Sequence, residues 1–190
     1  MLIIGIDPSL TRTAIAIGST PEDITLHSVE VRNFPGSIAN RFIRYHSIVS
    51  QVKSHLIGCE EPYVFLEGYG FVTQKAVDMA EFGSVLRVML LNYCKEGKLI
   101  EVPPKSLKSF TAENGNADKE KMAIAATKRW GVSFAGNHDE CDAYCLWRFG
   151  RAYFDLDTGL SAKQEEAIRN VKTPAPKVKK RKKKPTAGLV

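Results

Sequence analysis

The order of short apolar runs and amphipathic stretches along the chain is what most restricts its fold. Residues 3–6, 13–17 and 24–31 have the character of three consecutive β-strands separated by turn residues, most simply a meander. In residues 37–56 apolar side chains recur at steps of three and four, which predicts an amphipathic helix. Residues 63–67 then form an apolar run too short for a helix and rich in β-formers. This run predicts a buried strand that ends at an acid.

The second half of the chain predicts one more strand and several helices. Residues 74–95 are apolar on most sides, so this helix either lies wholly inside the core or packs one face on the sheet and presents another to a partner chain. Residues 99–102 predict a fifth strand that Pro103-Pro104 breaks. The later helices are expected from an N-cap at Asn116 through Trp130, from about His138 to Tyr153, and after a capping box at residues 161–164.

This order of elements describes an α/β domain. Strands and helices in this order favour a mixed five-stranded sheet with helices packed on it, in three layers. We expect one domain over residues 1–155, a short C-terminal helix over 156–171 and a disordered basic tail over 172–190.

Composition is that of an ordinary globular protein, with 44% apolar and 25% charged residues in a chain of 190. No apolar run reaches the roughly 18 residues that a membrane-spanning helix needs, and the amino terminus has no secretory pattern. We therefore expect a soluble, cytoplasmic protein that does not enter a membrane. The four cysteines contain no C-x-x-C pair, which makes zinc and disulfides improbable and favours buried small apolar side chains.

The net charge of +6 is concentrated at the carboxyl end of the chain. Removing the eight basic residues beyond position 171 leaves 19 of the 27 basic residues against all 21 acidic ones, a net charge of −2 for residues 1–171. Such a tail predicts sequence-independent binding to DNA phosphates, or alternatively a nuclear or organellar targeting signal. Its basic residues are Lys172, Lys177, Lys179, Lys180, Arg181, Lys182, Lys183 and Lys184.

Four carboxylates occupy positions from which they can converge. Asp7 ends the first predicted strand and Glu67 the fourth, while Asp139 and Asp142 lie three residues apart on one face of the helix from about 138 to 153. Taken singly, each is ordinary, because acids are common in turns and in the first turn of a helix. Together they are more specific, since a charged side chain at the end of a buried strand costs stability. If the strand ends are neighbours and the helix packs beside them, the four acids meet at one sheet edge.

Four carboxylates this close cannot all ionise without cations. Oxygen-only ligands select Mg²⁺ or Mn²⁺, and four carboxylates are enough for two ions. Such a pair activates a water and stabilises the leaving oxygen of a phosphodiester. The pattern therefore predicts metal-dependent phosphodiester hydrolysis with no nucleophilic side chain.

The motifs that contain these acids resemble the RuvC family of Holliday junction resolvases, within the RNase H-like superfamily. They are Gly5-Ile6-Asp7-Pro8-Ser9, Phe65-Leu66-Glu67 and Asp139-Glu140-Cys141-Asp142-Ala143. The stretches 102–108 and 116–119 resemble the bacteriophage-encoded branch of that family. The resemblance covers about residues 2–153, and all four family acids have a counterpart in order.

The resemblance implies an RNase H-like nuclease domain and a homodimeric, Mg²⁺-dependent endonuclease that nicks two strands of a four-way DNA junction symmetrically. Asp7, Glu67, Asp139 and Asp142 carry over as catalytic metal ligands for two ions, and Mn²⁺ is expected to substitute. Replication forks and flaps are further candidate substrates. Residues implied to contact DNA are Lys108 and Lys119, Lys105 as a third candidate, an aromatic that stacks at the crossover (Phe71 in preference to Tyr69), and the tail cations Lys179, Lys180, Arg181, Lys182, Lys183 and Lys184.

Other functions fit the sequence less well. An actin-type or sugar-kinase ATPase also begins Gly-Ile-Asp but needs a longer chain, and a D-x-E exonuclease needs an acid where Ser9 stands. An RNase H acting on RNA–DNA hybrids is the closest enzymatic alternative. A junction-binding protein that does not cleave is the alternative of another class. Four acids argue against it, because acids that face phosphates weaken binding unless metals neutralise them.

Overall fold

The computed structural model describes residues 1–32, 37–68, 76–94, 97–134 and 136–172 of the chain. Their elements, in chain order, are β1 (Ile3–Asp7), β2 (Arg12–Gly18), β3 (Thr25–Glu30), α1 (Ile38–Leu56), β4 (Tyr63–Glu67), α2 (Ala76–Leu90), β5 (Leu99–Val102), α3 (Pro104–Ala112), α4 (Lys119–Trp130), α5 (His138–Tyr153) and α6 (Ala162–Lys172). None of the helices in these described ranges is long and apolar enough to cross a bilayer.

The five strands form one mixed sheet in the order β3-β2-β1-β4-β5. β1, β2 and β3 are an antiparallel meander, whereas β4 and β5 run parallel to β1. Parallel neighbours need a crossover connection. α2 joins the neighbours β4 and β5, and α1 carries the chain from the edge strand β3 to β4 beside β1. The predicted mixed five-stranded α/β sheet is confirmed.

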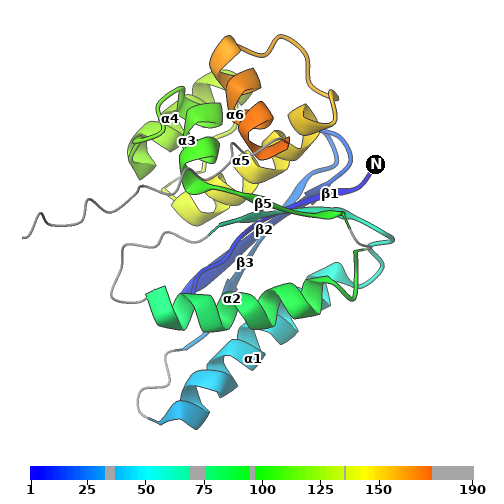
Figure 1. Ribbon diagram of the computed structural model, residues 1–190, viewed down its shortest axis with the longest axis vertical. Coiled ribbons are helices and arrows are strands. Elements are labelled where there is room, and N and C mark those ends of the chain that lie inside the picture. The colour runs from blue at the N-terminus through cyan, green and yellow to red at the C-terminus, as the bar shows by residue number, and fades with distance from the viewer. Residues whose placement is uncertain (33–36, 69–75, 95–96, 135, 173–190) are drawn as a thin grey trace, which may run out of the picture.

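Helices cover both faces of the sheet and make three layers, as expected (Figure 1). α1 and α2 pack on one face, over a core that includes Ile4 and Ile6 of β1. α5 lies on the other face, with α3, α4 and α6 around it, over a core that includes Ile3. Because side chains alternate across a strand, Asp7 follows Ile3 and Gly5 onto the face that α5 covers.

Glycine at position 5 allows α5 to lie directly against β1. A Cβ added at Gly5 would come within 2.6 Å of the backbone nitrogen of Trp147 and would also meet the carbonyl oxygen of Ala143. Both are backbone atoms of α5, so the helix itself would have to move. The close contact thus sets how near α5 approaches the end of β1.

Gly5→Ala is therefore expected to lower the free energy of unfolding by about 3 kcal/mol, the upper part of the usual range for overpacking a core. Gly68→Ala is a matched control, because the nearest atom to its new Cβ is the flexible end of the Glu101 side chain. Urea unfolding of the two variants measures the difference. Equal stabilities would show that α5 is not held against β1 as closely as the structure indicates.

One local expectation is wrong, and one helix was not predicted. α4 is capped by Asp118, whose carboxylate accepts the Lys121 amide at 2.9 Å, and not by Asn116. Asn116 instead donates its amide to the Asn114 side chain at 3.0 Å and so belongs to the preceding turn. Pro103 and Pro104 follow the end of β5, as expected. Pro104 also begins α3, because proline has no amide hydrogen that would need a partner in the first turn of a helix.

The structure decides between the two alternatives for α2, which does not lie wholly inside the core. Phe82 and Leu86 are buried, but Val77 is 66% and Val88 67% exposed. α2 belongs to an outer layer, so only one of its faces can meet the sheet. Its outward face is apolar and exposed.

Two further local expectations, on α6 and on the cysteines, fit. The capping box that begins α6 is present, because the Ser161 amide donates to the Gln164 side chain at 3.1 Å and the Gln164 amide donates to Ser161 Oγ at 3.4 Å. The four cysteines are free thiols; Cys94, Cys141 and Cys145 are buried, as expected, and Cys59 is half-buried.

Candidate active site

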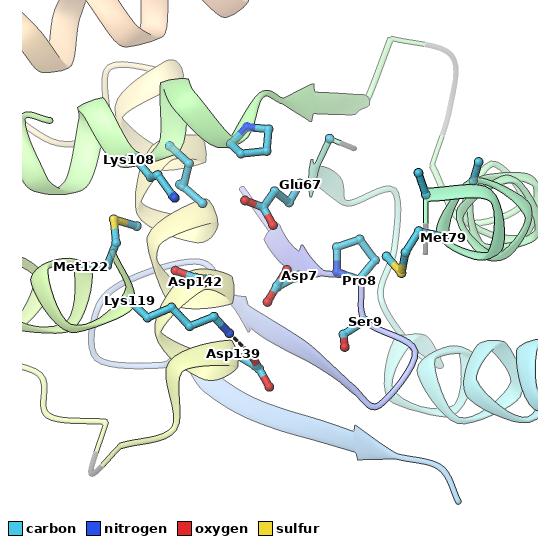
Figure 2. A pocket seen from close by; sticks show the side chains of 15 residues that line it. Asp7, Pro8, Ser9, Glu67, Met79, Lys108, Lys119, Met122, Asp139 and Asp142 are labelled. Carbon is cyan, nitrogen blue, oxygen red and sulfur yellow. Dashed lines mark hydrogen bonds and ion pairs between the residues drawn. The ribbon is translucent and has the colours of Figure 1, made fainter. Parts of the chain in front are cut away.

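The four carboxylates come together at the carboxyl end of the two central strands. β1 and β4 are parallel neighbours with Ile6 opposite Leu66, so the next residues, Asp7 and Glu67, stand side by side. Phe65 packs with the α5 core, and alternation places Glu67 on that same face. α5 begins beside this edge and brings Asp139 and Asp142 from its first turns (Figure 2). The predicted meeting of four acids at one sheet edge is confirmed.

These carboxylates line a cleft of about 430 Å³ (Figure 2). Lys108 of α3 and Lys119 of α4 are the cations that line it. The rest of the lining consists of Pro8 and Ser9 after β1, Gly68 after β4, Ala76, Met79 and Ala80 of α2, Pro104 and Leu107 of α3, and Met122 of α4. The cleft is therefore acidic at the sheet edge, with two lysines beside the acids and uncharged residues over the rest of its lining.

Burial and mutual repulsion disturb the ionisation of the acids. The pKa of the Asp7 carboxyl is raised well above its usual range, first by burial and then by the negative charges of Glu67 and Asp142. Burial also raises the pKa of Glu67, although a hydrogen bond from Asp7 and the nearby lysines oppose this. Burial and the neighbouring carboxylates therefore both act against the charged form of Asp7.

Asp142 shows the same effect more simply. Burial raises the pKa of its carboxyl to about 7, and the charge of Glu67 adds to the rise, while Lys119 and Lys108 oppose it. A carboxyl whose pKa remains near 7 shows that the two lysines do not balance the effects of burial and of the neighbouring acids. Such a site gains free energy when a cation binds.

Lys119 supplies part of the missing charge. Its ammonium lies 3.0 Å from the Asp139 carboxylate. Burial acts against its charge, but the hydrogen bond to Asp139 and the negative charges of Asp139, Asp142 and Asp7 prevail and raise the pKa of Lys119. Lys119 thus binds Asp139, one of the carboxylates predicted to be a metal ligand.

The donor set fits a hard divalent cation. All four groups are carboxylates, which suit Mg²⁺ or Mn²⁺ rather than zinc. As they stand, no three His, Cys, Asp or Glu side chains within the described ranges converge closely enough to hold one ion. The Lys119 ammonium bonds to an oxygen of Asp139 that a metal would use. Metal binding there would therefore require Lys119 to release Asp139, and the positive ion would favour the charged form of Asp7.

The raised pKa of Asp142 predicts how the stability of the metal-free protein depends on pH. In the unfolded chain this carboxyl ionises near pH 4, whereas in the folded protein its pKa is about 7. Between these values the folded state holds a proton that the unfolded state has lost, so the free energy of unfolding falls as pH rises.

Asp142→Asn removes this penalty. In EDTA, the variant is expected to exceed the wild type in free energy of unfolding by about 2–4 kcal/mol at pH 8, with the difference shrinking toward pH 4. Urea unfolding at pH 4, 6 and 8 measures it. A difference that does not change with pH would contradict a raised pKa at this position.

The predicted DNA-contact residues fall into three groups. Lys108 and Lys119 line the cleft with the acids. Lys105 faces a separate groove between α3 and α6, away from the four acids. Tyr69, Phe71 and the tail cations 179–184 lie outside the described residues.

The turn that follows Asp7 is held firmly, which sequence reasoning missed. Thr13 Oγ1 donates to the Ser9 carbonyl at 2.8 Å and accepts the Ser9 amide at 3.2 Å. Arg44 of α1 donates to the carbonyl of Leu10. A buried threonine four residues beyond Ser9 is the available signal, since such hydroxyls commonly bond to nearby backbone.

Comparisons with known proteins place the fold. No protein-family model matches the chain, and no curated protein does. Among solved structures, the chain is similar to Thermus thermophilus RuvC in complex with Holliday junction substrate, at 20% identity and a TM-score of 0.60 over 82% of this chain and 95% of that one. It is also similar to a second Thermus thermophilus RuvC structure, at 20% identity and a TM-score of 0.57 over 82% of this chain and 98% of that one. The chain therefore has the RNase H-like fold of RuvC.

Proposed function

We propose that this protein is a structure-specific endonuclease that cleaves branched DNA, in the first place four-way junctions. The observation that carries the proposal is the meeting of Asp7, Glu67, Asp139 and Asp142 in one cleft at the ends of β1, β4 and α5. The fold supports it, because the similar Thermus structure is one in complex with Holliday junction substrate.

The chain's own groups divide the work between metal binding and phosphate binding. The four carboxylates would hold two Mg²⁺ ions, and Mn²⁺ is expected to replace them. When bound, the ions activate a water and stabilise the leaving oxygen of the phosphodiester. Lys108 and Lys119 lie where a phosphate beside the acids can accept their hydrogen bonds.

Paired nicking needs two active sites, and α2 offers a surface through which two copies can join. Val77, Ser84, Val88 and Leu91 fall on one stripe of this segment and are exposed. Ser84 is small and bonds its own hydroxyl to the carbonyl of Ala80 at 2.8 Å, so a second helix can approach closely there. A two-fold axis at this stripe would place the same residues of both copies against each other.

The basic tail adds affinity that does not depend on sequence. Its eight cations can neutralise several phosphates, with binding that weakens steeply as salt rises. Such contacts suit a protein that selects branched DNA by shape, and they extend the candidate substrates to replication forks and flaps. Nuclear or organellar targeting remains the alternative role.

The test is cleavage of an immobile four-way junction beside a linear duplex of the same sequence and an RNA–DNA hybrid, each with Mg²⁺ and with EDTA. Metal-dependent, symmetric nicks in the junction alone support the proposal. Preferential cutting of the hybrid would make the protein an RNase H, and tight junction binding without cutting would make it an architectural protein. Either result would overturn the proposal.

A further inference from the structure

The cleft has a second wall that metal and phosphate chemistry leaves unused. The acids and lysines come from β1, β4, α3, α4 and α5. The second wall presents apolar atoms from Ala76, Met79 and Ala80 of α2 and from Pro8, in the turn after β1. Figure 2 shows Met79 pointing from α2 into the cleft on the side of Pro8, away from Lys119 and Asp139. A hydrated ion or a phosphate gains nothing from such a surface. The wall therefore fits an apolar part of the substrate.

This wall is held in place on both sides. Arg41 of α1 bonds to Asp78 at 3.1 Å and lies 3.3 Å from the Glu81 carboxylate, and these two acids flank Met79 and Ala80 in the sequence. On the other side, the bonds between Ser9 and Thr13 fix the turn that carries Pro8. A preformed apolar surface binds a ligand without the entropic cost of ordering it first.

We propose that Met79, with Pro8, holds the base of a nucleotide next to the scissile phosphate. The inference rests on the proposed function, because it takes the phosphate to lie at the four acids. A base attached to the neighbouring sugar is the apolar group of DNA that comes closest to that point. Bases at a branch point are the ones that unstack most cheaply, and an unstacked base needs a new surface to cover its face.

Methionine suits this role better than a rigid side chain. Its thioether makes favourable contacts with aromatic rings and adapts to rings of different shape. The subsite would therefore accept every base but favour those that fill it best. Met79 becomes a residue that determines which sequences are cut fastest, and not a group that takes part in the hydrolysis.

Met79→Ala is expected to slow cleavage of a four-way junction about 10-fold, the upper end of what loss of a sulfur–ring contact supplies. Met79→Leu, which keeps the apolar surface, should lose less than half of that. Ser54→Ala, on the exposed side of α1 and outside both the cleft and the α2 stripe, is the control and should cleave at the wild-type rate. Thermal unfolding of all three variants checks that the fold is intact.

The decisive measurement uses junctions in which the nucleotide on either side of the cleavage site is replaced, one at a time, by an abasic site. At the position that meets Met79, wild type and Met79→Ala should cleave the abasic junction at equal rates, because the contact no longer exists. An abasic site in the middle of the same arm should leave the 10-fold difference unchanged.

Two outcomes would overturn the inference in distinguishable ways. If the wild type cleaves junctions but the Met79→Ala effect is the same with and without the base at both positions, Met79 supports the fold and holds no base. If the wild type cleaves no junction under any condition, the proposed function fails first and the subsite fails with it.

Discussion

Asp7→Asn is expected to slow junction cleavage by a factor of about a thousand or more while leaving junction binding within a few-fold of the wild type. The substitution keeps the size and shape of the side chain but removes a charged ligand from the centre of the acidic cleft. Metal ions contribute several kcal/mol to stabilising the transition state of phosphodiester hydrolysis, and every 1.4 kcal/mol or so is a factor of ten in rate. Single-turnover cleavage in Mg²⁺ and binding in Ca²⁺ measure the two effects separately.

Glu140→Gln is the matched control for this experiment. Glu140 lies on the same helix, between the two acids of α5, but its carboxylate accepts a hydrogen bond from Ser28 of β3 at 2.7 Å and does not line the cleft. It should cleave within a few-fold of the wild type. Retained nicking in Asp7→Asn would remove Asp7 from the mechanism, and an equal loss in Glu140→Gln would point to a general effect of charge on α5.

The position of the acids could be predicted from the sequence because it follows from local rules. An apolar strand that ends in an acid specifies where that acid lies, and the parallel pairing of β1 and β4 then makes Asp7 and Glu67 neighbours. The spacing of Asp139 and Asp142 fixes their common face on α5 in the same way. What remained to be shown was that α5 packs beside β1, which depends on the absence of a side chain at Gly5.

The apolar wall of the cleft could not be predicted in this way. α2 is apolar on most sides, so its sequence does not indicate that Met79 faces the cleft while Val77 faces outward. The N-cap of α4 had a similar ambiguity, because Asn116 and Asp118 are both good capping residues and the turn at Asn114 decides between them. Tertiary packing decides the first choice and a local turn the second, and neither can be read from the pattern of residue types alone.

The electrostatics of the cleft link stability to function. Burying Asp7, Glu67 and Asp142 together costs the metal-free protein stability, as their raised pKa values show. A protein gains nothing structurally from such a cluster, since apolar residues would fill the space at lower cost. Bound cations would offset this cost, so the cluster is consistent with the metal-binding role proposed for it.

Val88→Asp is expected to weaken self-association about 100-fold and to convert paired nicks into single ones. On a two-fold axis the substitution places a new carboxylate on each copy in an apolar contact, and burying unpaired charges costs several kcal/mol. Ile124→Asp is the matched control, because Ile124 of α4 is as exposed as Val88, at 67%, but lies off α2.

Sedimentation equilibrium gives the dissociation constant. A supercoiled cruciform plasmid separates linear products, which need two coordinated cuts, from nicked circles. If Val88→Asp stays dimeric and linearises the plasmid as the wild type does, the two copies must join through another surface. If both variants dissociate, the dimer depends on exposed apolar residues in general and not on the α2 stripe. A monomeric variant that still nicks would show that each cleft is chemically complete by itself, and that pairing two clefts is what produces symmetric cleavage of the junction.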